Sequence, residues 1–288
     1  MAVFSLLFVS CTNNDKNTVR IAYLPITHAL PLVSLKNCDD VKVELVRYGS
    51  WPELLDALNT GRVDGASVLI ELAMKAKSQG IGLKAVALGH TDGNVIVVAN
   101  DVNSLADLNG RPFAIPHRTS THHVLLREAL RKDGVGDGNV NIVEMSPPEM
   151  PSALVNGQIG GYCVAEPFGS VGVNTGKGKV LYRSEELWEN SICCGFVLNE
   201  RSYLMKKDKM DKVIKAYHES GHALEDKNAA LVQAKTILSQ SDEILDQSLQ
   251  WIKFSDLTIT EKAYSELADK VIKYGIIDNP PTYSEFVK

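Results

Sequence analysis

The sequence has few cysteines, no excess of positive charge and no long hydrophobic run. Its five cysteines show no Cys-x-x-Cys pair and no Cys/His finger spacing, which argues against structural zinc of the finger type. The net charge of -5 argues against nucleic-acid binding, because phosphate contacts need a concentrated Lys/Arg surface. The apolar segment Ala2 to Val9 is too short to span a bilayer. G-x-S-x-G does not occur, so this hydrolase motif is missing.

What is present is the composition of an ordinary globular chain, with 44% hydrophobic and 23% charged residues among 288. This composition excludes disorder, collagen and coiled coil. The length suits one large α/β unit or two lobes. A chain of this size is stabilised by its core, so we interpret four cysteines as small buried residues rather than a disulfide framework. They are Cys38, Cys163, Cys193 and Cys194.

The N-terminus reads as the end of a secretion signal. Residues 1–14 carry no charge, and the apolar run ends in Ser10 followed by Cys11. This junction resembles a bacterial lipobox, in which Cys11 becomes the lipidated first residue after cleavage at Ser10. Residues 12–18 would then be a tether. The alternative is a buried N-terminal strand.

Short β-rich segments alternate with helical stretches from Val19 onward, which is typical of βαβ units on a parallel sheet. The expected strands are 19–24, 41–48, 65–69, 83–88, 94–100, 111–115, 140–145, 162–165 and 192–199. Apolar spacing in the tail predicts helices at 210–224, 229–238, 244–251 and 261–274.

The two halves of the chain share an internal repeat. Residues 50–65 align with residues 146–161, since both read S-x-P-E, then A-L-x-x-G, then a strand. Ser caps a helix, Pro lies in its first turn, Glu favours its positive N-terminus and Gly ends it. Residues 19–35 and 111–130 also match, as strand, proline, Thr-His and helix. The shared order predicts two related lobes that face one another.

Ligands of such sheets bind outside the carboxyl ends of the strands, so two facing lobes would form one cleft. The residues placed there are Thr27, His28, Ser50, Trp51, Glu71, His90, His117, Thr121, His122 and Glu166. His123 also falls in this region, but successive helical residues point about 100° apart and cannot both face the cleft. We choose His122 because it matches His28 in the repeat.

Three segments resemble the solute-binding proteins of ABC importers in the nitrate, sulfonate, taurine and bicarbonate class. They are Arg-Ile-Ala-Tyr-Leu-Pro at 20–25, Leu-x-x-Gly-Arg-Val-Asp-Gly-Ala at 58–66 and Val-Ala-Glu-Pro-Phe-Gly at 164–169. The resemblance covers roughly residues 19–200 and is most specific in Ala-Glu-Pro-Phe-Gly. It implies the α/β, two-lobe periplasmic-binding type II fold, with the ligand cleft between the lobes.

The resemblance also implies how the chain is divided. Residues 1–18 would be the lipoprotein signal and tether, 19–99 with 200–288 a discontinuous lobe one, and 100–199 lobe two. The chain would cross near Asn100 and return near Asn199, and the tail helices would complete lobe one.

The function that the resemblance implies is binding rather than catalysis. We expect an extracytoplasmic or periplasmic lipoprotein, anchored to the cell membrane through lipid at Cys11, that acts as a monomer and binds no nucleic acid. It would capture a small solute and deliver it to permease and ATPase subunits. The solute would be an oxyanion such as nitrate, sulfonate or bicarbonate, or a related organic molecule. A thiamine-pyrimidine synthase family uses the same fold, so an enzyme of that kind, with Cys193-Cys194 as part of its cysteine cluster, is an alternative.

The histidines of the predicted cleft leave three interpretations open. Neutral imidazoles at helix N-termini would donate hydrogen bonds to an anion, helped by backbone N–H groups and the helix dipole. Alternatively, several of them, with Glu71 or Glu166, would coordinate zinc or another divalent metal; otherwise no cofactor is expected. The third interpretation is that they cap turns and pack. Trp51 would stack on a planar solute, with Tyr23 for a pyrimidine, or hold the helix entry. Glu166 would contact solute or mark a bend.

Overall fold

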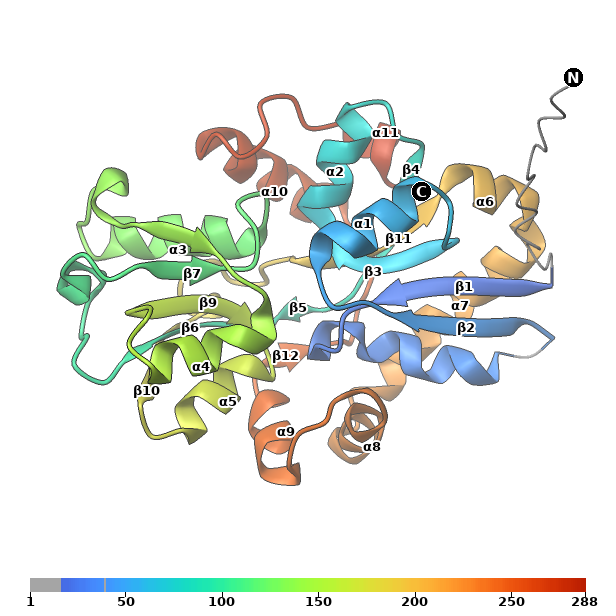
Figure 1. The fold of residues 1–288 in the computed structure, drawn as a ribbon. Coiled ribbons are helices and arrows are strands. Elements are labelled where there is room, and N and C mark those ends of the chain that lie inside the picture. The colour runs from blue at the N-terminus through green and yellow to red at the C-terminus, as the bar shows by residue number, and fades with distance from the viewer. Residues whose placement is uncertain (1–16, 39) are drawn as a thin grey trace, which may run out of the picture.

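The structure is a computed structural model that describes residues 17–38 and 40–288. The predicted lipidation site Cys11, and with it most of the predicted signal and tether, lies outside the described residues. Two lobes are visible in Figure 1, each built on a five-stranded sheet with helices packed on it. In the described part of the chain, no helix is both long and apolar enough to cross a membrane.

Lobe one contains a mixed sheet in the order β2-β1-β3-β11-β4. Its strands are β1 (Thr18–Tyr23), β2 (Lys42–Arg47), β3 (Gly65–Leu69), β4 (Leu83–Leu88) and β11 (Cys194–Asn199). β1 pairs in parallel with β2 and β3, whereas β11 runs antiparallel to β3 and β4. The covering helices are the 3-10 helix η1 (Thr27–Asn37), α1 (Trp51–Asn59) and α2 (Ile70–Ser78).

Lobe two repeats this arrangement, with its sheet in the order β10-β6-β9-β7-β8. Its strands are β6 (Asn94–Ala99), β7 (Phe113–Ile115), β8 (Ile142–Glu144), β9 (Gly161–Ala165) and β10 (Gly178–Arg183). Its helices are α3 (Thr121–Lys132), α4 (Met150–Val155) and α5 (Phe168–Asn174), with 3-10 turns η2 (Leu105–Leu108), η3 (Asp137–Asn139), η4 (Pro147–Glu149) and η5 (Ser184–Glu186). β7 pairs in parallel with β8 and β9, and β6 is the antiparallel strand.

The strand order and register agree with the internal repeat. Ile21 pairs with Gly65 between β1 and β3, and Phe113 pairs with Gly161 between β7 and β9. A Cβ on Gly65 would lie 2.8 Å from Leu198, and one on Gly161 would lie 2.9 Å from Val98. Both glycines therefore allow an antiparallel strand to approach closely, which explains why the repeat keeps glycine at this position.

Both chain crossings fall one strand earlier than the predicted positions near Asn100 and Asn199. β6 already pairs within the second sheet and β11 already pairs within the first, so the first crossing lies between β4 and β6 and the second between η5 and β11. Each lobe thus takes one strand that arrives from the other lobe, and that strand is the antiparallel one. A continuous apolar run such as Val95–Val98 fits the core of either sheet, so periodicity alone could not assign it.

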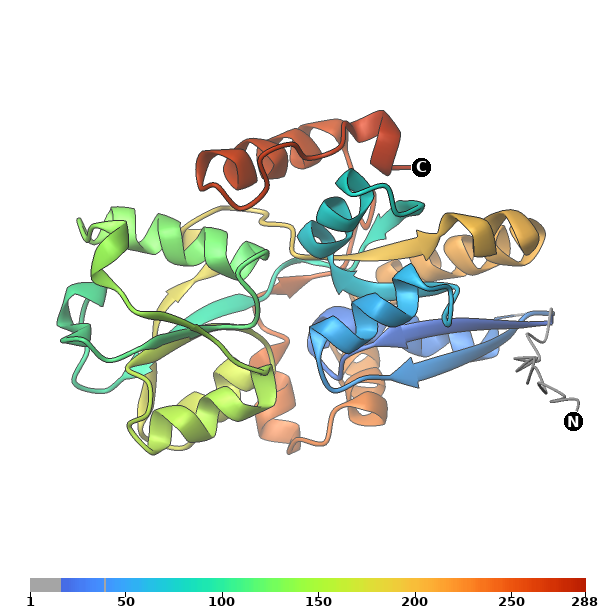
Figure 2. The same cartoon turned by 45° about the horizontal axis from the view of Figure 1, so that its top comes forward.

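The tail does not simply complete lobe one, as the resemblance implied. It comprises α6 (Glu200–Met205), α7 (Lys207–Ala223), α8 (Lys227–Ile237), α9 (Asp242–Ser248), β12 (Ile252–Lys253), α10 (Glu261–Lys273) and α11 (Tyr283–Phe286). β12 pairs with the short β5 (Thr91–Asp92) in the first crossing. Figures 1 and 2 place α9 and α10 on opposite sides of the region where the lobes meet.

One hydrogen bond and one ion pair connect α9 and α10 to lobe two. Gln247 of α9 accepts a hydrogen bond from Asn174 at 2.7 Å. Lys270 of α10 forms an ion pair with Glu128 of α3 at 2.8 Å. These contacts depend on side chains far apart in sequence, which is why helical periodicity could predict the helices but not their partners.

Candidate functional site

The predicted site residues follow strand ends that meet where the two lobes face each other. Thr27 and His28 follow β1, and Glu71 and His90 follow β3 and β4. Thr121 follows β7 in lobe two. All five side chains are fully buried, because the lobes pack against each other at this junction. We call the buried group formed by His28, Glu71, His90, Thr121, His122, Cys193 and Cys194 the inner cluster.

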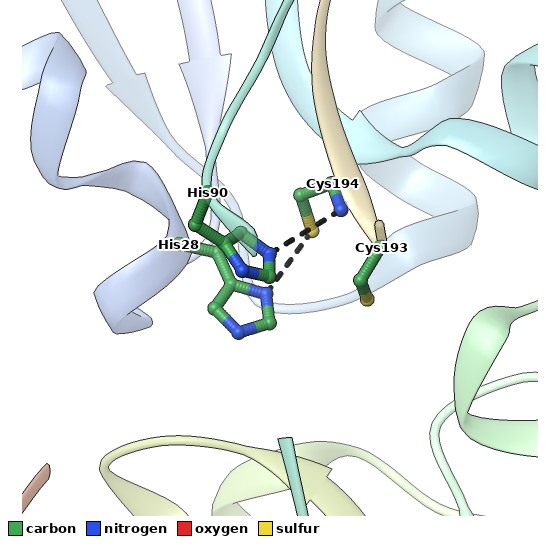
Figure 3. A group of neighbouring side chains, drawn as sticks. All are labelled: His28, His90, Cys193 and Cys194. Atoms are coloured by element: carbon green, nitrogen blue, oxygen red, sulfur yellow. Dashed lines mark hydrogen bonds between the residues drawn. The ribbon is translucent and has the colours of Figure 1, made fainter. Parts of the chain in front are cut away.

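Two histidines and a cysteine of lobe one form the tightest part of the inner cluster (Figure 3). The His28 and His90 rings stack with their centroids 3.4 Å apart. His28 Nδ1 lies 3.4 Å from Cys194 Sγ, and the Cys194 backbone N–H donates to His90 Nε2 at 3.5 Å. Gly89 makes this approach possible, because a Cβ there would lie 2.8 Å from the His28 carbonyl oxygen.

Lobe two adds Thr121 and His122 from the first turn of α3. The Thr121 hydroxyl hydrogen-bonds the Glu71 carboxyl and also lies 2.6 Å from the Ile192 carbonyl oxygen. His122 Nδ1 lies 4.0 Å from Cys193 Sγ. The predicted pair His28 and His122 therefore lies on opposite lobes, close enough for His122 to perturb the His28 charge state.

Ser120 determines which histidine of α3 faces the inner cluster. Its hydroxyl accepts from the His123 N–H at 3.3 Å and caps the helix. His122 is 1% exposed, while His123 turns away and places Nδ1 2.8 Å from the Arg118 carbonyl oxygen. The structure thus brings His122 into the cluster and leaves His123 outside it.

Thr27 and Glu166 form a second contact between the lobes. The Thr27 N–H and hydroxyl both donate to the Glu166 carbonyl oxygen, at 2.9 and 3.0 Å. The Glu166 carboxylate accepts from the Ser170 N–H at 2.8 Å and from the Ser248 hydroxyl at 3.4 Å. Glu166 therefore joins lobe two, lobe one and α9, and it precedes a cis proline, Pro167.

Burial keeps the inner cluster almost free of charge. Desolvation lowers the pKa of His90 and His122 to about 3, and it lowers that of His28 well below its usual range with help from the neighbouring histidines. Desolvation also raises the pKa of Glu71 to about 8 and that of the Cys193 thiol. At neutral pH the imidazoles are unprotonated and the Glu71 carboxyl is largely protonated.

Three further predicted site residues belong neither to the inner cluster nor to the contact between Thr27 and Glu166. Ser50 precedes α1 without a side-chain cap, and Trp51 is 3% exposed within the lobe-one core, as expected for a residue that holds the helix entry. His117 is half-buried and accepts a hydrogen bond from the Thr119 N–H at 2.9 Å. Trp51 therefore packs in the lobe-one core and His117 makes a local hydrogen bond, while the predicted contact of all three residues with solute stays a prediction.

Sequence analysis missed Cys193 and Cys194 as members of the site. They were interpreted as small buried residues because a chain of this size is stabilised by its core, and otherwise as part of the cysteine cluster of the enzyme alternative. The available signal was that two adjacent cysteines lie in the predicted strand 192–199, where successive side chains point to opposite faces. Asn94, at the start of β6, lies beside Cys193 and was also missed.

A separate pocket opens at the edge of the interlobe junction, which we call the outer pocket. Its volume is about 280 Å³. It is lined by Leu24, Pro25, Ile26, Arg47, Tyr48, Gly49, Pro147, Pro148 and Phe168. The lining comes from both lobes and is mostly apolar, with Arg47 as its basic group. The segment from Leu24 to His28 contributes to both the outer pocket and the inner cluster.

The sequence profile of the NMT1-like family matches residues 12–238. The chain belongs to the NMT1-like family. In this family member, the predicted resemblance to solute-binding proteins of ABC importers is confirmed, because its relatives include proteins of that class. Solved proteins of the same class share its two-lobe periplasmic-binding fold, which confirms the predicted fold class.

This family member is similar to three proteins of known origin. It is 40% identical to the ligand-binding component of an ABC-type import system from Staphylococcus aureus, solved with zinc bound; the match covers 94% of this chain and 96% of that one, with a TM-score of 0.90. It is 32% identical to the taurine-binding periplasmic protein of Escherichia coli, covering 50% of this chain and 45% of the relative. It is 24% identical to the nitrate/nitrite-binding protein NrtA of Nostoc, covering 69% and 51%.

The chain spans between 30% and 54% of the length of the curated relatives it matches. Binding proteins of import systems, such as those for taurine and nitrate, stand among these relatives, and this agrees with the prediction of binding rather than catalysis.

Proposed function

We propose that this protein is the solute-binding component of an ABC import system and that it encloses its solute between the two lobes. The observation that carries this proposal is a set of buried polar atoms at the interlobe junction, for which the described residues offer no hydrogen-bond partner. They are Glu71 Oε2, His90 Nδ1 and His122 Nε2. Each such atom costs about 1–3 kcal/mol when buried alone, so a solute that pairs with them would offset that cost.

Closure of the lobes would trap the solute. The contacts between Thr121 and Glu71 and between Thr27 and Glu166 exist only when the lobes meet. A solute that binds this closed state better than an open one shifts the population toward it, and the closed form is the one presented to permease and ATPase subunits.

A small organic molecule or an oxyanion is one candidate solute, and the outer pocket favours it. Arg47 would face the acidic group, and Tyr48 and Phe168 would cover an apolar body. The names of the taurine-binding and nitrate/nitrite-binding relatives support this class. The inner cluster has a different chemistry, because it presents imidazoles and thiols rather than an apolar surface.

The proposed location is outside the cytoplasmic membrane, with Cys11 as the lipid anchor of a monomer. The junction of an apolar run, Ser10 and Cys11 supports this proposal. Detergent partitioning of the expressed full-length chain tests it: wild type should enter the detergent phase, and Cys11→Ser should stay in the aqueous phase. Equal partitioning of the two would remove the anchor.

Native mass spectrometry and small-angle scattering test solute capture. Protein purified without chelators should carry a bound small molecule or ion, and its radius of gyration should increase when that solute is removed by dialysis. An unchanged radius, in both the purified and stripped protein and at saturating nitrate, taurine or Zn²⁺, would contradict the closing clamp.

A further inference from the structure

We propose that His28, His90, Cys193 and Cys194 bind a divalent metal ion of the zinc type, and that this ion is the solute. The inference rests on the proposed function, because it names the solute class of the same interlobe site. One ligand atom from each of the four side chains can be chosen so that all lie within 4.8 Å of one another. Figure 3 shows the two rings beside the two cysteines.

The geometry is near that of a four-coordinate zinc site. Zn–S bonds of about 2.3 Å and Zn–N bonds of about 2.0–2.1 Å place tetrahedral ligand atoms about 3.3–3.8 Å apart. His28 Nδ1 and Cys194 Sγ are already 3.4 Å apart. A small inward movement of the remaining side chains would complete the set, and His90 would give up only the long hydrogen bond of 3.5 Å that its Nε2 accepts from the Cys194 N–H.

Charge favours a cation over an anion at this position. All four side chains are 0% exposed, and their imidazole nitrogens and cysteine sulfurs are donors that zinc binds in proteins. Two thiolates would neutralise one divalent cation, so the loaded site would bury no net charge. Within the described residues, Lys206 is the one buried Lys or Arg side chain, and it pairs with Asp64 rather than with the inner cluster.

The donor set also selects the kind of metal. Two sulfur and two nitrogen donors in a tetrahedral arrangement favour zinc over magnesium or calcium, which prefer oxygen ligands. The relative from Staphylococcus aureus, 40% identical over 94% of this chain, was solved with zinc bound. That observation supports the same class of ion here.

Lobe two closes over the proposed site. Cys194 is the first residue of β11 in lobe one, while His122 approaches Cys193 from α3 of lobe two, at 4.0 Å. His122 Nε2 has no partner in the described part of the chain. His122 therefore lies where closure of the lobes would bring it beside a bound ion.

Cobalt substitution tests the ligand set in the full chain, reduced and stripped of metal. Bound Co²⁺ should show a thiolate-to-cobalt charge-transfer band and the visible bands of tetrahedral geometry. Cys194→Ser and His90→Ala should each weaken Co²⁺ binding by about 100-fold or more. Loss of a group that only supports a metal ligand costs up to about 100-fold in metal affinity, and loss of a ligand itself should cost at least as much. Cys163→Ser, which changes a buried cysteine of β9, is the matched control and should bind as wild type.

Two further measurements keep the result decisive. The double variant His218→Gln/His222→Gln removes the histidine pair of α7 and should leave the cobalt spectrum unchanged. Zinc X-ray absorption of the wild type should show two sulfur and two nitrogen neighbours, a result that needs no variant to fold. A cobalt spectrum without the thiolate band, or zinc with nitrogen and oxygen neighbours only, would overturn the proposed site.

The free ion can be distinguished from a metal chelate through the outer pocket. Zinc citrate should bind the wild type no more tightly than Zn²⁺ alone; tighter binding of zinc citrate that Arg47→Ala abolishes would instead identify a chelate and overturn the free ion as solute. If no metal binds but another solute compacts the protein, this inference fails and the proposed function stands. If zinc binds at the four residues without compaction, the metal site stands and the clamp fails.

Discussion

Thr121 of lobe two and Glu71 of lobe one form a buried hydrogen bond that joins the lobes at the inner cluster. The Thr121 hydroxyl has one hydrogen and lies against two acceptors, Glu71 Oε1 and the Ile192 carbonyl oxygen. Because burial raises the pKa of Glu71 to about 8, its carboxyl carries a proton at neutral pH. Glu71 then donates to Thr121, and Thr121 donates to Ile192.

This relationship predicts that Glu71 acts as a neutral donor. Glu71→Gln should change the free energy of unfolding at pH 7 by less than about 1 kcal/mol, because an amide N–H replaces the acid O–H. Thr121→Val should cost about 1–3 kcal/mol, because it leaves two buried polar partners unsatisfied. Urea unfolding measures both, with the exposed Thr236→Val as control. If Glu71→Gln lowered the free energy of unfolding as much as Thr121→Val does, a protonated Glu71 would be contradicted.

Glu128 should make the protein less stable in acid. Burial alone would raise the pKa of its carboxyl, but hydrogen bonds and charge from Lys270, Tyr274 and Arg131 lower it to about 2. A lowered native pKa stabilises the fold above the ordinary value of roughly 4.3, and this stability is lost as the pH falls from there through about 2. Glu128→Gln should lower the free energy of unfolding by about 2 kcal/mol at pH 6 and change it little at pH 2. Denaturant titrations at both values check this, and an equal loss at both would show that Glu128 acts through packing.

The ion pair of Lys206 and Asp64 should be necessary for lobe one. Lys206 Nζ lies 2.8 Å from Asp64 Oδ2 and 2.7 Å from the Thr18 carbonyl oxygen, with both side chains 5% exposed. Lys206→Met leaves a buried carboxylate unpaired and should cost about 3–5 kcal/mol. Adding Asp64→Asn to that variant should recover part of the loss, because the uncompensated charge is gone. Thermal unfolding of the two variants decides this, and no recovery would mean that the stem of Lys206 matters more than its charge.

The glycines of the repeat should not tolerate a side chain. Gly161→Ala should destabilise the protein by about 1–3 kcal/mol, because the new Cβ would lie 2.9 Å from Val98 and 3.0 Å from the Val97 carbonyl oxygen. Gly138→Ala is the control, since nothing lies within 4 Å of its Cβ position. Equal denaturation midpoints for the two variants would show that the sheet of lobe two adjusts without cost.

Local signals in the sequence predicted most of the elements. Apolar runs predicted β3 and β4 with the bounds that the structure has, and helical spacing predicted α7 to α10 within a few residues. The half-exposed edge strand β10 was missed, because it pairs with β6 alone and shows no apolar alternation strong enough to identify it. η1 was predicted as a helix and contains Pro31, but its 3-10 geometry was not predicted.

The sequence by itself determined the two-lobe repeat, the strand ends that meet between the lobes and the histidines at those ends, because caps, turns and strands depend on neighbouring residues. Only the tertiary structure decided that β6 belongs to the sheet of lobe two and β11 to the sheet of lobe one. It also decided that α9 and α10 contact lobe two, and that Cys193 and Cys194 lie beside His28 and His90. His28 and Cys194 are separated by 166 positions. Contacts over such separations follow from how the two sheets pack, and a periodicity of two or 3.6 residues contains no information about that packing.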